Sequence, residues 1–98
     1  MTKTELAEAL AEEAGLTKKK AREAIDSLTE IITDSLTEDE GEKVTIRGFG
    51  TFDLSHREER KGVDPQDHDK TIKIPARTVP QFRAGSRLKQ AVREAHSE

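Results

Sequence analysis

Residues 47–52 read RGFGTF, and this stretch decides how the chain around it is organised. Gly48 and Gly50 flank Phe49, which is typical of a tight turn between two short strands that places the aromatic ring in a core. Apolar and polar residues alternate with period two on both sides of the turn, over 44–54. The sequence therefore predicts a β-hairpin at the middle of the chain.

Two amphipathic helices are predicted before this hairpin. Thr2 and Glu5 have capping-box spacing, so the first helix should begin near Lys3, and Gly15 should end it. Thr17 is the expected N-cap of a second, longer helix, which ends in the acidic run TEDEGEK. The apolar stripe of that helix consists of Ala21, Ala24, Ile25, Leu28, Ile31, Ile32 and Leu36.

The segment between Leu54 and Val79 is strand-like at its ends but has few apolar residues in its middle. At its centre lies the proline-containing turn KGVDPQDHDK, residues 61–70. Each leg is about ten residues, or roughly 30 Å when extended. Such a ribbon cannot bury itself, so its charged sides are suited to lie along a polar partner.

The last part of the chain is predicted to form an edge strand and then a helix. Pro75 and Pro80 cannot donate to a strand ladder, so the strand that contains them should lie at an edge or leave the sheet. A C-terminal helix is predicted over about 82–96. Its inner face would carry Phe82, Leu88 and Val92, and its outer face Arg83, Arg87, Lys89 and Arg93.

Composition indicates one domain that needs a second subunit. The chain has 98 residues, of which 32% are hydrophobic, and its three aromatic residues are all phenylalanine. A chain of this size buries a modest share of its surface, and no cysteine is present to staple it. We therefore predict a single α+β domain over 1–98, with a helical base over about 1–40 and a sheet and arm over about 42–79. We expect it to be an obligate oligomer.

Charge is distributed unevenly along the chain. The net charge is −3, but residues 1–42 carry 12 acids and 5 bases, whereas residues 43–98 carry 8 acids and 12 bases. Residues 70–93 contain no acid at all. A basic half of this kind is the pattern expected of a nucleic-acid-binding surface.

These blocks together resemble the HU/IHF family of DNA-bending nucleoid proteins. The matching stretches are RGFGTF, HREERKG, the proline in GVDPQ, and IKIPARTVPQFRAGSRLK, and they cover essentially the whole chain in order. The resemblance implies an IHF-like intertwined dimer, a homodimer or a heterodimer, with a helical base, a β-sheet saddle and one protruding two-stranded arm per subunit. It implies binding to double-stranded DNA through the minor groove, where wedging side chains kink the duplex, as in HU and IHF themselves.

The resemblance also implies roles for individual residues. Pro65 at the arm tip would be the DNA-intercalating wedge. Basic residues of the arm and the saddle would contact phosphates: Lys3, Arg57, Arg60, Lys61, Lys70, Lys73, Arg77, Arg83, Arg87 and Lys89.

The arm tip departs from the family pattern. The family's tip usually reads Gly-Arg-Asn-Pro, followed by one residue and Thr-Gly, whereas this chain has Val63 and Asp64 before the proline and one residue more in the turn. Ser86 stands where the family usually has lysine, with Arg87 beside it. Residues 56–73 contain five acids and five lysine or arginine residues, so the arm is formally neutral.

Two other functions are also compatible with the sequence. The chain could be a helix-turn-helix regulator, although its recognition helix would carry several acids that repel phosphates. It could also be a family relative whose acidic tip binds a protein instead of DNA. Enzymatic activity, a cofactor and a metal are not expected, because no nucleophile–base pair or ligand spacing is present. No signal-peptide core or membrane-spanning run is found, so a cytoplasmic, nucleoid-associated protein is predicted.

Overall fold

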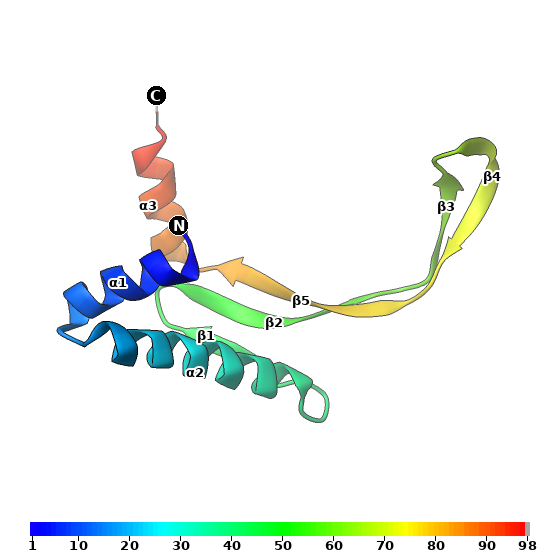
Figure 1. Ribbon diagram of the computed structural model, residues 1–98. Helices are drawn as coiled ribbons and strands as arrows, with labels where there is room; N and C mark the ends of the chain where they lie inside the picture. The colour runs from blue at the N-terminus through cyan, green and yellow to red at the C-terminus, as the bar shows by residue number, and fades with distance from the viewer. Residues whose placement is uncertain (98) are drawn as a thin grey trace.

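The computed structural model describes residues 1–97 and shows an extended α+β molecule with a long arm (Figure 1). In chain order the elements are α1 (Lys3–Ala14), α2 (Lys18–Thr37), β1 (Val44–Ile46), β2 (Gly50–Arg57), β3 (Arg60–Asp64), β4 (Asp67–Ile74), β5 (Arg77–Ala84) and α3 (Ser86–Ala95). The strands form a three-stranded antiparallel sheet in the order β1-β2-β5 and a separate two-stranded ribbon of β3 and β4. The predicted α+β class and the protruding ribbon are both confirmed.

The caps of α1 and α2 are those that the sequence predicted. Thr2 Oγ1 accepts a hydrogen bond from the Glu5 N–H at 3.2 Å, and Thr17 Oγ1 accepts one from the Lys20 N–H at 3.1 Å. Gly15 ends α1 in the left-handed conformation with φ 68°, which glycine adopts at little cost.

The sheet has one apolar face and one polar face because side chains alternate along each strand. Phe52 is directly opposite Phe82, with ring centroids 4.9 Å apart, and Phe49 in the β1–β2 turn also contacts Phe82. Leu54 lies on the same face and approaches Gly41 just after α2. This apolar face is therefore turned toward the helical base.

The predicted start of the last helix was wrong. Residues 82–84 belong to β5, and α3 begins at Ser86 after Gly85 as its N-cap. Consequently Phe82 and Arg83 are strand residues, on opposite faces of the sheet. Pro80 is tolerated in β5 because this strand pairs only with β2 and is an edge strand, as predicted, whereas Pro75 lies between β4 and β5 and belongs to neither strand.

A single chain buries very little. Among the described hydrophobic residues only Ala7, Ala11 and Ala21 are buried, where α1 packs against α2. The accessible surface is 8545 Å², whereas a compact monomer of 10.9 kDa exposes about 5,600 Å². The radius of gyration is 19.0 Å, against about 13 Å for a compact domain of this length. The large uncovered surface is shared by the arm and by the apolar faces of the helices and the sheet.

Candidate nucleic-acid interface

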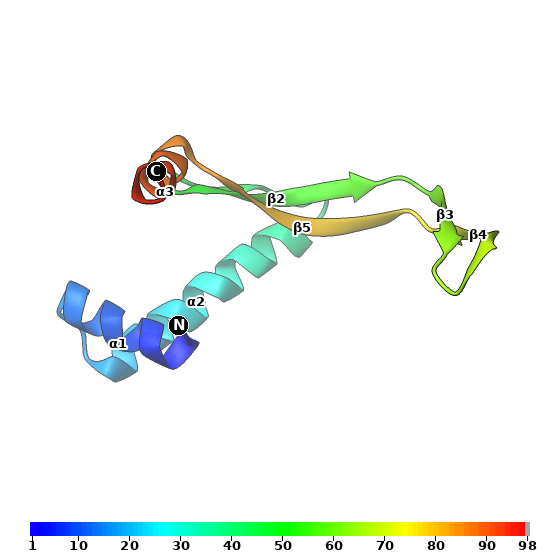
Figure 2. The same ribbon diagram turned by 90° about the horizontal axis from the view of Figure 1, so that it is seen from above.

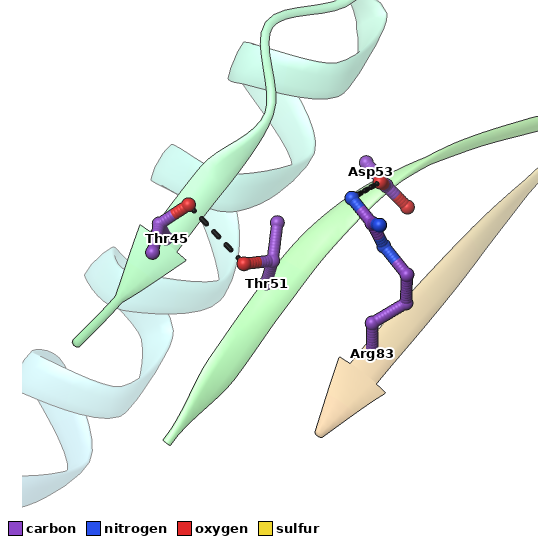
Figure 3. A network of polar contacts seen from close by, with 4 residues as sticks. All are labelled: Thr45, Thr51, Asp53 and Arg83. Carbon is purple, nitrogen blue, oxygen red and sulfur yellow. Dashed lines mark hydrogen bonds and ion pairs between the residues drawn. The ribbon is translucent and has the colours of Figure 1, made fainter. Parts of the chain in front are cut away.

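The polar face of the sheet carries three of the predicted basic residues. Arg83 is opposite Thr51, and Arg57 is opposite Arg77, so all four side chains lie on the face away from Phe52. Thr45 and Thr51 also lie on this face, and their hydroxyl oxygens are 3.2 Å apart (Figure 3). Sequence analysis did not single out these threonines, although their alternation with Phe52 was the signal that could have placed them.

Three arginines meet where the sheet continues into the arm. Arg57, Arg60 and Arg77 line one recess of about 340 Å³, together with Ser55, Glu58, Ile74 and Pro75. Each arginine comes from a different strand, β2, β3 or β5. This junction therefore concentrates positive charge at the base of the ribbon.

The ribbon extends far from the helical base, as two perpendicular views show (Figures 1 and 2). Lys61 is directly opposite Lys73, so both side chains lie on one face. Ile72 and Ile74 lie on the other face, close over Gly62. Lys61 and Lys73 thus share one face of the arm, whereas Arg60 lies with Ile72 and Ile74 on the other, partly apolar face.

The tip of the ribbon is a short turn in which two of the acids have a structural role. Asp64 and Asp67 are the last paired residues, so Pro65 and Gln66 form the turn itself, and Pro65 is exposed. Asp64 Oδ1 accepts a hydrogen bond from the Gln66 N–H at 2.8 Å, and Asp67 Oδ1 accepts one from the Asp69 N–H at 3.1 Å. Aspartate before proline is favoured in such turns because its carboxylate can accept from the chain two residues on.

The predicted basic residues in the last helix and at the N-terminus lie apart from the ribbon. Arg87 and Lys89 are on α3, and the aliphatic part of Arg87 packs over Gly48. Lys3, in the first turn of α1, forms an ion pair with Asp26 of α2 at 2.5 Å. The structure therefore places Lys3 at the helical base, where an acid of the same chain neutralises it.

Two more of the predicted basic residues form ion pairs within the chain. Arg83 Nη2 is 2.5 Å from Asp53 Oδ2, and Lys73 Nζ is 3.1 Å from Glu59 Oε1 (the first pair is shown in Figure 3). The sequence predicted the positions of these cations but not their partners. No further ion pair within 4.0 Å involves a predicted basic residue in the part of the chain that the structure describes.

A helical base, a sheet with one polar face and a protruding two-stranded arm define a class of small α+β proteins that carry a β-ribbon arm. The family model described as "Bacterial DNA-binding protein" matches residues 1–93. The chain belongs to this family, and the resemblance predicted from the sequence is confirmed.

Curated relatives and solved structures agree with this assignment. The chain is 50% identical over 93 residues to the DNA-binding protein HU of Staphylococcus aureus and 45% identical to that of Geobacillus stearothermophilus, covering 95% of this chain and 100% of each relative. A structure described as an Anabaena HU–DNA cocrystal matches with a TM-score of 0.84 and 38% identity, over 94% of this chain and 97% of that one. The solution structure of a mutant of transcription factor 1 matches with a TM-score of 0.63 and 32% identity, covering 96% and 92% of the two chains.

No helix within residues 1–97 is long and apolar enough to cross a membrane. The same residues contain no group of three or more histidine, cysteine or acidic side chains placed to hold a metal ion.

Proposed function

We propose that this chain is an architectural DNA-binding protein that acts as a dimer, binds duplex DNA with low sequence specificity through the minor groove, and bends or compacts it. The observation that carries the proposal is the junction of the polar sheet face with the ribbon, where Arg57, Arg60 and Arg77 line one recess. The relatives named above are DNA-binding proteins HU, and one of the similar solved structures is a cocrystal of HU with DNA.

Phosphates would be contacted at four places in this proposal. Arg57 and Arg77 would lie under the duplex on the sheet, on the same face as Arg83, which forms an ion pair with Asp53 in the free protein. Four residues of the arm and two of α3 would extend the contact: Arg60, Lys61, Lys70 and Lys73, then Arg87 and Lys89. Lys3 would contribute from the helical base. Such contacts act on the DNA backbone and give affinity without reading sequence.

Pro65 is proposed as the wedge that enters the base stack. Its exposure at the far end of the arm and its position in a tight turn support this role. The exposed hydrophobic residues of the helices support the dimer, since Leu28 and Ile31 on α2 and Leu6 on α1 are 48%, 62% and 47% exposed in one chain. A cytoplasmic, nucleoid-associated location follows from the same proposal, as does the absence of catalysis.

The alternatives gain no support from the molecule. A helix-turn-helix regulator would need a basic recognition helix, whereas α2 carries Glu23, Asp26, Glu30 and Asp34. The acidic tip has a structural explanation without a protein partner, since Asp64 and Asp67 each accept a hydrogen bond from the turn that they occupy.

Binding to a random-sequence duplex tests the proposal. We expect a shift in gel mobility that weakens as salt rises, because the contacts release counterions, together with a shortened end-to-end distance of the DNA in a fluorescence transfer assay. Binding that occurs with only one DNA sequence would favour a regulator. Failure to bind any duplex at low salt would overturn the proposal.

A further inference from the structure

Asp53 is the single acidic residue of β2 and β5, and it lies on the polar face of the sheet. The same face carries Arg57, Arg77 and Arg83. An acid is unfavourable on a surface that approaches phosphates, because it repels them. The position of Asp53 on this face therefore calls for a compensating contact.

In the ion pair between Asp53 and Arg83, the carboxylate is the buried partner. The Asp53 side chain is only 16% exposed, whereas that of Arg83 is 61% exposed. Oδ2 binds Arg83, and Oδ1 is buried without a hydrogen-bond partner within the described residues. If Arg83 moved away, both oxygens of a mostly buried carboxylate would be left without a partner, which is strongly unfavourable.

Two other ion pairs of the chain have more exposed partners. Lys73 and Glu59 are 72% and 53% exposed, so water can replace either partner at little cost. Lys20 and Glu23, on the first turns of α2, are similarly exposed, at 70% and 52% with 3.5 Å between them. Burial of its acid therefore distinguishes the Asp53–Arg83 pair from these two.

We propose that Asp53 limits the affinity of this protein for DNA by holding the Arg83 guanidinium as an internal substitute for a phosphate. The inference rests on the proposed function and names the residue that regulates that site. A cation already neutralised by Asp53 contributes little net charge, so it releases few DNA counterions. Arg57 and Arg77, which have no such acid, carry the phosphate contacts of the sheet.

The first experiment compares three substitutions that each remove one negative charge: Asp53→Asn, Glu59→Gln and Glu23→Gln. Affinity for a random-sequence duplex is measured between 50 and 200 mM salt. Asp53→Asn frees two arginines per dimer, so the slope of log affinity against log salt should steepen by up to about 1.8. The gain in affinity between 200 and 50 mM should then be about tenfold larger than for the wild type. Glu59→Gln should have a smaller effect, and the control Glu23→Gln should leave the slope unchanged.

The second experiment uses arginine substitutions, and its comparison in the wild type does not depend on the folding of the Asp53 variant. Arg83→Gln should weaken binding less than twofold in the wild type, whereas Arg57→Gln on the same face should weaken it several-fold. In an Asp53→Asn background, Arg83→Gln should cost as much as Arg57→Gln.

The outcomes separate this inference from the proposed function. If the wild type binds duplex DNA but Asp53→Asn changes the slope no more than Glu23→Gln, Asp53 does not limit affinity. An Arg83→Gln cost equal to that of Arg57→Gln in the wild type would likewise overturn the inference. If neither the wild type nor any variant binds DNA at 50 mM salt, it is the proposed function that fails.

Discussion

Arg57 and Arg77 are directly opposed partners on β2 and β5, at the last register position before the chain leaves the sheet for the arm. Like charges directly opposite each other destabilise a strand pair by about 0.2–1 kcal/mol. Both side chains also line the recess that contains Arg60. The pair is therefore costly in the free protein and becomes favourable when an anion lies between the two arginines.

Replacing one member of this pair should separate stability from binding. Arg77→Gln removes the repulsion, so the free energy of unfolding should stay equal or rise by up to about 1 kcal/mol. DNA affinity should fall, and the salt slope should become shallower by up to about 1.8 per dimer. Urea unfolding and a salt titration of binding check the two effects. A loss of stability with unchanged affinity would show that the arginine is structural.

Folding should be coupled to association, since one chain buries only three alanines among its described hydrophobic residues. The midpoint of thermal unfolding should rise with protein concentration. Each tenfold increase adds about 1.4 kcal/mol to the free energy of unfolding of the dimer, which corresponds to a rise of about 3–5 °C for some 200 residues. Calorimetry at three concentrations measures it. A midpoint that does not move, with a monomer mass in solution, would contradict the dimer.

Gly50 should tolerate no side chain, because a Cβ there would meet the ring of Phe82 and lie 2.7 Å from the Arg83 carbonyl oxygen. Gly50→Ala should therefore lower the free energy of unfolding by about 3 kcal/mol, the upper end of the usual cost of overpacking. Gly15→Ala is the matched control, since no atom lies within 4 Å of its Cβ and its cost is that of φ 68° alone, about 1 kcal/mol. Equal losses for the two variants at one protein concentration would show that Phe82 does not pack over Gly50.

The caps and turns were predictable because their chemistry is local. Thr2, Gly15 and Thr17 each act on residues within a few positions, so spacing in the sequence was enough to place both helix starts and the first helix end. The strand that contains Phe82 was not predictable in the same way. Pro80 is compatible with the first turn of a helix and with an edge strand, and only the pairing of β5 with β2 decides between them.

The ion pairs of the candidate interface were beyond sequence analysis for a similar reason. Asp53 and Arg83 are 30 residues apart, and they meet because the register places Asp53 opposite Gln81, two residues from Arg83. Alternation alone puts Asp53 on the face away from Phe52, but it does not say which cation lies next to it. The basic residues could be named from the sequence, whereas their neutralisation by acids required the structure.

Pro65→Ala should reduce DNA bending more than DNA affinity. The proline is exposed at the tip of the arm, and affinity in this class of complex comes mainly from phosphate contacts. The bend angle, measured by fluorescence transfer across a duplex, should fall clearly while the dissociation constant changes little. Gln66→Ala, in the same turn, is the control and should leave the angle unchanged. A bend that survives Pro65→Ala would exclude the proline as the wedge.

Restoring arginine and asparagine at the arm tip should tighten binding without disturbing the turn. Val63 is 59% exposed, so Val63→Arg can be accommodated, and Asp64→Asn keeps the side-chain oxygen that accepts from the Gln66 N–H. The double substitution adds one cation and removes one acid per arm. If each new arginine meets a phosphate, the slope of log affinity against log salt should steepen by up to about 0.9 per arm, with higher affinity at low salt and a similar bend.

Val63→Arg with Asp64→Ala is the control for the turn, because it changes the charge equally but removes the acceptor. This control should gain less affinity. If the first double variant matches the wild type in both slope and affinity, the tip does not touch DNA.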